Sequence, residues 1–242
     1  MSFGLSRGKD LSDAGVGITP AELPTLPDEA ITNPLAGRLD PRVWFPGPGH
    51  PLHLEIGCGK GSFLLQEAGA SLGVNYLGIE YAREFYLYAA DRVRRRGLAN
   101  VRMLHTDATA LLAWRMPDAV VDVIHLYFSD PWPKTKHHKN RVVQDRFLAD
   151  AWRVLVPGGE LRVVTDHDEL WAWDLEHFRR WTGSGVPADL AARFGLPGAP
   201  FEMRPFTAPT WAEEGELVGT NYERKMCVDR PPHACVLRKR TA

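Results

Sequence analysis

The chain has 242 residues, 44% of them hydrophobic and 24% charged, which excludes an intrinsically disordered chain, a collagen and a coiled coil. Its formal net charge of −1 excludes a uniformly basic nucleic-acid-binding protein, so cations that bind a polyanion must be concentrated on one face. Its three cysteines, Cys58, Cys227 and Cys235, form no C-x-x-C pair, and no apolar run suits a signal peptide or a membrane span. We therefore expect a cytoplasmic protein without disulfides and without membrane contact.

The order of the predicted elements indicates the fold. Residues 1–50 are rich in proline and glycine and predict an irregular N-terminal arm, followed by one domain over residues 51–242. Strands are predicted at 52–56, 76–80, 101–105, 120–128 and 160–165, alternating with helices at 60–69, 82–96, 108–114, 144–156 and 167–181. Residues 183–210 are loop-rich, and strand-like runs at 218–227 and 234–238 are expected to pair. The pattern predicts a doubly wound α/β fold: a mostly parallel, seven-stranded sheet with an antiparallel C-terminal edge.

A glycine-rich loop separates the first predicted strand from the first helix. It reads Glu55-Ile56-Gly57-Cys58-Gly59-Lys60-Gly61, and glycines let a backbone turn tightly and approach a ligand. The spacing is G-x-G-x-G rather than the G-x-G-x-x-G of dinucleotide-binding proteins. A carboxylate at Glu55 would repel a pyrophosphate but suits a cationic ligand with an amino group, such as S-adenosylmethionine (SAM).

Acidic residues also follow the next three predicted strands. Glu80 stands where a carboxylate takes ribose hydroxyls, Asp107 where one can accept from an adenine amino group, and Asp130 follows the fourth strand. Any one of these acids could instead cap a helix. Four acids together with the glycine loop favour SAM over a nicotinamide-type dinucleotide.

The segment Ser129-Asp130-Pro131-Trp132-Pro133-Lys134 is the second signature. Two prolines hold an indole beside a carboxylate, which suits stacking and hydrogen bonding to a purine. A basic run follows, and it supplies the local concentration of positive charge that RNA phosphates would need, although such runs are commonly solvated surface. Its members are Lys134, Lys136, His137, His138, Lys139, Asn140 and Arg141. Adjacent histidines without further ligands are a poor metal site, so no metal is expected.

These segments resemble the bacterial tRNA (guanine-N7)-methyltransferase family. The likeness is carried by residues 54–61, by 130–134 with the basic run, by 154–166, and by Thr220-Asn221-Tyr222-Glu223-Arg224-Lys225. The first and third segments occur widely among SAM methyltransferases, whereas the second and fourth are specific to this family. Together they span residues 52–226. This chain has Ser129 where the family usually has proline.

The resemblance implies a Rossmann-like class I methyltransferase that moves a methyl group from SAM to N7 of the variable-loop guanosine, position 46, of tRNA. It implies SAM-binding roles for Glu55, Glu80, Asp107 and Asp130, with Asp130 also the active-site acid. It implies substrate contacts from Lys134, Asp166, Thr220, Asn221, Tyr222 and Glu223, and RNA contacts from residues 136–141. On this basis we hypothesise that Asp130 bridges cofactor and base, while Glu223 and Asp166 hold guanine N1–H and the 2-amino group.

Three other functions stay open from the sequence. Ser129-Asp130-Pro131-Trp132 loosely resembles the loop of amino-methyltransferases that act on other RNA or DNA bases. A non-catalytic RNA-binding subunit with a SAM-type fold is a second possibility, and a small-molecule methyltransferase is a third. The sequence leaves monomer and homodimer equally open.

Overall fold

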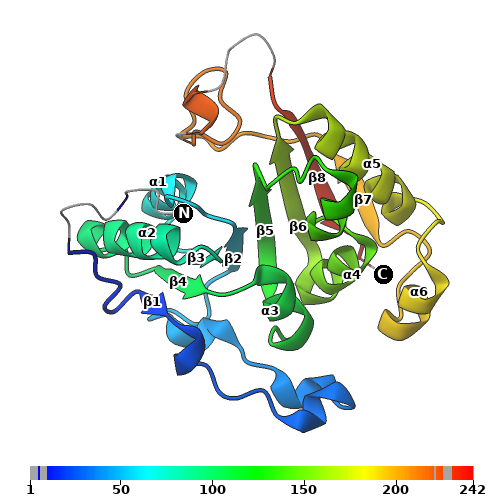
Figure 1. Cartoon of the computed structure of the whole chain (residues 1–242), viewed down its shortest axis with the longest axis horizontal. Coiled ribbons are helices and arrows are strands. Elements are labelled where there is room, and N and C mark those ends of the chain that lie inside the picture. The colour runs from blue at the N-terminus through cyan, green and yellow to red at the C-terminus, as the bar shows by residue number, and fades with distance from the viewer. Residues whose placement is uncertain (1–4, 6–9, 221, 226–230, 242) are drawn as a thin grey trace. The chain divides into compact units, whose positions relative to one another are not determined.

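The computed structural model describes residues 5, 10–220, 222–225 and 231–241. They form two compact units (Figure 1). The first contains the described residues up to Pro117 together with residues 208–225, and the second contains residues 118–207 with 231–241. Within these described ranges, no helix combines the length and apolar character that crossing a membrane requires.

The first unit is built on four parallel strands in the order β1-β4-β3-β2. They are β1 (Gly17–Ile18), β2 (Leu52–Ile56), β3 (Asn75–Glu80) and β4 (Val101–His105), with helices α1 (Ser62–Ala70), α2 (Arg83–Arg96) and α3 (Ala108–Trp114) after β2, β3 and β4. All six residues of β3 are buried, as expected for a strand with neighbours on both edges. Because the strands are parallel, their carboxyl ends meet at one edge, which is where such sheets bind ligands.

The N-terminal arm contributes to this unit more than its composition suggests. Its described residues form four short 3-10 helices, at Pro20–Glu22, Asp28–Ile31, Pro34–Gly37 and Pro41–Trp44. Gly17–Ile18 pairs with β4, and the Tyr86 hydroxyl donates to Asp13 Oδ2 at 2.8 Å. The described residues therefore form eight strands rather than the expected seven. Strand β1 could not be predicted from the sequence, because it is only two residues long and shows no apolar alternation.

The second unit contains the antiparallel edge. Its strands β5 (Val121–Tyr127), β6 (Leu155–Thr165), β7 (Phe201–Arg204) and β8 (His233–Lys239) lie in the order β5-β6-β8-β7. Strands β5 and β6 are parallel, whereas β8 runs antiparallel to both β6 and β7. Its helices are α4 (Asp145–Val154), α5 (Asp168–Thr182) and α6 (Ala188–Phe194). The predicted class, α/β with a mostly parallel sheet and an antiparallel edge, is confirmed.

One strand of that edge comes from a different segment than predicted. On the side away from β6, β8 pairs with β7, which comes from the region expected to be loop. The segment 218–227 was expected in this place, but its described part forms a loop and the 3-10 helix η6 (Glu223–Lys225). The Glu223 carboxylate accepts hydrogen bonds from the backbone N–H of Leu217 and Val218, at 2.6 and 3.0 Å, so a side chain takes donors that a partner strand would use. Residues 226 and 227 lie outside the described residues.

Asp174 is a buried acid whose charge should make stability depend on pH. It lies on α5 and is 1% exposed. Burial raises the pKa of Asp174 to about 8, and the positive charge of Arg141 opposes this rise only in part. The buried thiol of Cys235 lies close enough for the Asp174 charge to raise its pKa as well. In the unfolded chain an aspartate titrates near pH ~3.9.

The free energy of unfolding of the wild type should fall as the pH rises because of Asp174, and we expect Asp174→Asn to remove this fall. Between pH ~4 and about 8 the folded wild type keeps a proton that the unfolded chain releases, so its free energy of unfolding falls with rising pH. The Tm of Asp174→Asn should therefore exceed that of wild type by several degrees at pH ~8.5 and match it near pH ~4.5. Thermal unfolding against pH, with the exposed Asp189→Asn as control, checks this. Parallel curves for wild type and Asp174→Asn would contradict it.

Candidate active site

The glycine-rich loop after β2 has the backbone that its sequence predicts. Gly57, Gly59 and Gly61 all have positive φ, at 71°, 53° and 67°, a region that glycine enters without steric cost. The loop is anchored to β3, since the N–H of Gly57 donates to the carbonyl of Ile79 at 2.8 Å. A Cβ on Gly61 would approach Ala89 of α2 within 3.1 Å, so a larger residue there would press on that helix.

Glu80 closes this loop from the end of β3. One carboxylate oxygen accepts from the N–H of Gly59 and the other from the N–H of Ala82, both at 2.8 Å. The carboxylate is therefore fixed beside the glycine loop. Each oxygen keeps a second lone pair with which a hydroxyl donor can bond.

Glu55 is the most unusual group at this edge. It is 5% exposed, and its Oε2 is buried without a hydrogen-bond partner among the described residues. Burial and the negative charge of Glu80 raise the pKa of Glu55 well above its usual value, against a backbone hydrogen bond from Leu64. An orphaned buried carboxyl oxygen is costly unless a partner arrives. A cationic amino group would supply that partner, so the residues present fit SAM.

Asp107 has the helix-capping geometry that the sequence left open. Its Oδ1 accepts from the backbone N–H of Thr109 and Ala110, at 2.8 and 3.1 Å, at the start of α3. Partial burial raises its pKa, but the hydrogen bonds from Thr109 and Ala110 outweigh this and lower the pKa below the usual value. The side chain is exposed, so capping leaves its other oxygen available at the same edge as Glu80.

Residues 211–220 and 222–225, here called the 211–225 loop, are held on α1, the helix that follows the glycine loop. The Gln66 side chain donates to the carbonyl of Gly219 at 2.8 Å, and the Trp211 indole N–H donates to Glu67 at 2.5 Å. Within the loop, Arg224 pairs with Glu216 at 2.5 Å. The loop is thus fixed within the unit that carries Glu55 and Glu80.

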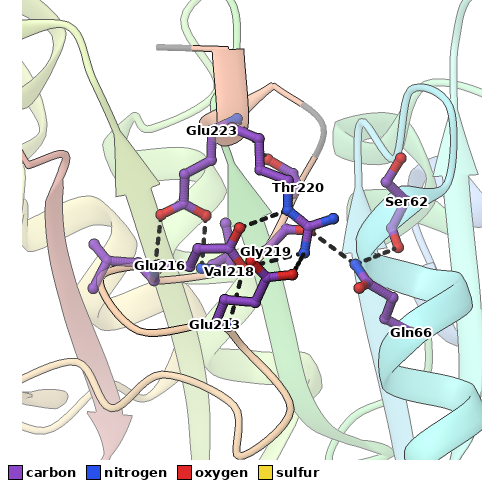
Figure 2. Close-up of polar contacts among 10 residues, drawn as sticks. Ser62, Gln66, Glu213, Glu216, Val218, Gly219, Thr220 and Glu223 are labelled. Atoms are coloured by element: carbon purple, nitrogen blue, oxygen red, sulfur yellow. Dashed lines mark hydrogen bonds and ion pairs between the residues drawn. The ribbon is translucent and has the colours of Figure 1, made fainter. Parts of the chain in front are cut away.

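Two of the expected substrate residues organise this loop. The Thr220 hydroxyl accepts from the Glu223 N–H at 3.0 Å, and the Glu223 carboxylate takes the two backbone donors described above (Figure 2). Tyr222 is 55% exposed. Asn221 lies outside the described residues.

The other expected residues belong to the second unit, where a strained loop follows β5. Phe128 and Trp132 both have positive φ, 52° and 42°, a costly conformation for bulky residues. Between them Asp130 is exposed. The Trp132 ring stacks on His137, with centroids 5.7 Å apart and planes 5° from parallel. The indole is thus fixed, partly exposed and close in sequence to a carboxylate.

The basic run forms a short 3-10 helix, η5 (Thr135–Asn140). Lys134, Lys136, Lys139 and Asn140 are exposed, whereas His137 and His138 are half-buried. The Gln144 side chain donates to the carbonyls of Lys139 and Arg141, at 2.8 and 3.1 Å, and fixes the end of η5. The exposed cations are therefore carried on an ordered backbone.

Arg141 differs from the rest of the run because it is buried, with 3% of its surface exposed. Its guanidinium donates to the Pro131 carbonyl at 2.9 Å and to Glu169 at 2.7 Å. This position suits support of residues 128–132, here called the Asp130 loop, better than contact with a phosphate. The composition of the basic run does not distinguish Arg141 from its neighbours. What distinguishes it is contact with Glu169 and Trp173, which lie on α5, far away in the sequence.

Asp166 is exposed directly after β6, the parallel neighbour of β5. It therefore lies at the same edge of the second unit as the Asp130 loop. No group of three or more histidines, cysteines, aspartates or glutamates among the described residues could hold a metal ion.

The α/β fold, with a mostly parallel sheet and an antiparallel edge, agrees with the class of protein that a family model gives, a methyltransferase. The chain matches a family model described as "Putative methyltransferase" over residues 49–183. It is 34% identical over 168 residues to the tRNA (guanine-N(7)-)-methyltransferase of Streptococcus pneumoniae (strain 70585), covering 69% of this chain and 79% of the relative. The relative of the same name from Enterococcus faecalis (strain ATCC 700802 / V583) is 38% identical over 135 residues, 56% of this chain and 63% of that protein.

Among solved structures, the aminoglycoside resistance methyltransferase NpmB1 has a TM-score of 0.49 and 17% identity, over 89% of this chain and 94% of that one. On the strength of the family model and the sequence relatives, the chain belongs to the tRNA (guanine-N(7)-)-methyltransferase family. The resemblance drawn from its motifs is thereby confirmed.

Proposed function

We propose that this protein transfers a methyl group from SAM to N7 of the variable-loop guanosine, position 46, of tRNA, in the cytoplasm. The observation that carries the proposal is the strained loop with exposed Asp130 and the fixed Trp132 ring. Strain at bulky residues persists only where the surrounding structure enforces it, and it concentrates at functional sites. Membership of a family whose curated members bear this activity as their name supports the same reaction.

Glu55, Glu80 and Asp107 are the proposed SAM-binding side chains, with Gly57, Gly59 and Gly61 allowing close backbone approach. Glu55 would accept from the amino group, since its buried Oε2 has no hydrogen-bond partner in the part of the chain that the structure describes. Glu80 would take ribose hydroxyls and Asp107 the adenine amino group. When bound, SAM would supply a methyl group on positively charged sulfur. The lone pair of guanine N7 would form the new N–C bond as the S–C bond breaks and the neutral thioether S-adenosylhomocysteine leaves, and N7 carries no proton that must be removed.

Since no general base is required, this chain's residues contribute by orienting the base and stabilising charge. Methylation leaves positive charge on the purine, and the Asp130 carboxylate would stabilise it as it develops. Trp132, stacked on His137, would offer a surface on which the base lies. Asp130 is therefore the proposed catalytic residue.

Lys134, Asp166 and the segment Thr220–Glu223 are the proposed substrate contacts. The hypothesis that Glu223 reads guanine needs refinement, because both of its oxygens already accept backbone N–H groups. A carboxylate oxygen can accept more than one hydrogen bond. Glu223 would thus hold the 211–225 loop in shape and offer its remaining lone pairs to the base.

The exposed lysines of the basic run would contact tRNA phosphates. Replacing Lys134, Lys136 and Lys139 with glutamine should weaken tRNA binding and reduce the log–log salt slope of affinity by about 2.7, the release expected for three phosphate contacts. Binding titrations at several salt concentrations check this. Glutamine at Arg179 and Arg193, exposed in the same unit, should leave the slope unchanged. An equal slope in the lysine variant would refute the phosphate contacts.

The reaction is tested by incubating the protein with methyl-labelled SAM and unmodified tRNA, digesting the product and identifying the labelled nucleoside. We expect 7-methylguanosine. Label in N6-methyladenosine or a methylated cytidine would indicate an amino-methyltransferase instead. SAM and tRNA binding without transfer would indicate a non-catalytic subunit. Transfer only to small acceptors, with weak and salt-independent tRNA binding, would indicate a small-molecule enzyme.

A further inference from the structure

The Asp130 loop needs an external support, because its own backbone is unfavourable. Phe128 and Trp132 bracket Ser129, Asp130 and Pro131 and both lie in the left-handed region. Non-glycine residues leave this region unless neighbouring groups hold them there. The loop is short, so a displaced Pro131 carbonyl would move its two neighbours, Asp130 and Trp132.

The Arg141 side chain contacts that carbonyl and links it to α5. Its Nε donates to the Pro131 carbonyl at 2.9 Å, while its Nη2 donates to Glu169 at 2.7 Å. The guanidinium also lies 5.2 Å from the centre of the Trp173 ring. Trp173 is itself fixed, since its indole N–H donates to the Val143 carbonyl at 2.7 Å.

These contacts use three features that only arginine combines. A guanidinium donates in two directions from one rigid plane and stacks on an aromatic face, whereas a lysine ammonium is a single point charge on a flexible stem. With 3% exposure, Arg141 has few other ways to satisfy its donors. Glu169 and Trp173 come from one turn of α5, so the loop is tied to a rigid helix.

We propose that Arg141, oriented by Glu169 and Trp173, is a positioning residue that sets the placement of Asp130 and Trp132 through the Pro131 carbonyl. This inference rests on the proposed function, because it explains how the guanine base is aligned for methyl transfer. It assigns Arg141 no contact with tRNA or SAM. Disturbing Arg141 should therefore reduce turnover and leave both binding steps intact.

Glu169→Gln is the mildest test, because Glu169 has a half-exposed side chain and glutamine keeps its size, although the buried Arg141 guanidinium loses one ionic partner. We expect its kcat to fall about tenfold, and that of Arg141→Lys about a hundredfold, since small misplacements are costly in alignment-driven reactions. The KM for tRNA and the Kd for SAM should stay within about twofold of wild type, a change smaller than one hydrogen bond makes. Glu176→Gln, on the same helix and paired with Arg180 at 3.0 Å, is the matched control and should leave kcat unchanged.

A second measurement does not depend on activity. The indole N–H resonance of Trp132, assigned by its loss in Trp132→Phe, should shift in Glu169→Gln and stay in place in Glu176→Gln. If wild type makes no 7-methylguanosine, the proposed function fails and this resonance alone decides on Arg141. An unshifted resonance, unchanged kcat in Glu169→Gln, or a raised KM with normal kcat would each overturn the proposal. If Arg141→Lys does not fold, Glu169→Gln still decides.

Discussion

Asp130→Ala should reduce kcat by about a hundred- to a thousandfold, the usual effect of removing a group that stabilises charge in a transition state. Asp130 is exposed, so its loss should leave the fold and the Tm intact. Guanine N7 has no proton to give up, so in the proposed reaction the carboxylate would act through its charge rather than as a base. Single-turnover methyl transfer at saturating SAM and tRNA measures this directly.

Asp130→Asn separates charge from position. The amide has nearly the shape of the carboxylate and lacks its charge, so we expect Asn to reduce kcat almost as much as Ala. Asp189→Ala, an exposed aspartate on α6, serves as the control and should behave as wild type. Near-normal turnover in Asp130→Ala would show that the charge lies elsewhere, and Glu223 would be the next carboxylate to replace.

Glu55→Gln should weaken SAM binding by about 10- to 150-fold, the range for losing one hydrogen bond to a charged group. The buried Oε2 of Glu55 has no partner among the described residues, so the ligand's amino group would satisfy it. Calorimetry with SAM gives the Kd, and Glu176→Gln controls for the loss of one negative charge.

The same variant should change how SAM binding depends on pH. Burial and the charge of Glu80 raise the pKa of Glu55 well above its usual value, so in the free protein this carboxyl keeps its proton to higher pH than an ordinary glutamate, and below its pKa a cationic ligand must displace that proton. Wild-type affinity should therefore increase as the pH rises toward the Glu55 pKa, and Glu55→Gln should lose that increase. An identical pH profile in wild type and variant would exclude Glu55 as the partner of the amino group.

Local sequence pattern was sufficient for most strands and for the glycine loop. β2 to β5, β8 and the second half of β6 were predicted, because their apolar runs are set by the residues themselves, whereas β6 begins at Leu155, where the end of a helix was predicted. β1 and β7 were missed because one has two residues and the other lies among prolines at 197, 200 and 205. For β7, burial of Phe201 at 0% exposure against Trp181 outweighs the loop-like composition.

The roles of single side chains depended on contacts that no local pattern contains. Arg141 looked like its basic neighbours, but Glu169, 28 residues later, gives it a partner that buries it. Gln66 carried no signal at all, although its side chain holds Gly219 from 153 residues away. Such pairings form only when the chain folds, which is why Glu223 was expected to read the base and is found shaping its own loop.

Substitution of one atom in the substrate tests the central claim most directly. A tRNA transcript with 7-deazaguanosine at position 46 keeps the Watson–Crick edge and the stacking surface but has carbon in place of N7. We expect normal binding and no methyl transfer to this transcript, with full transfer to the matched guanosine transcript. Transfer of label to the 7-deaza transcript at the wild-type rate would mean that N7 of this guanosine is not the acceptor.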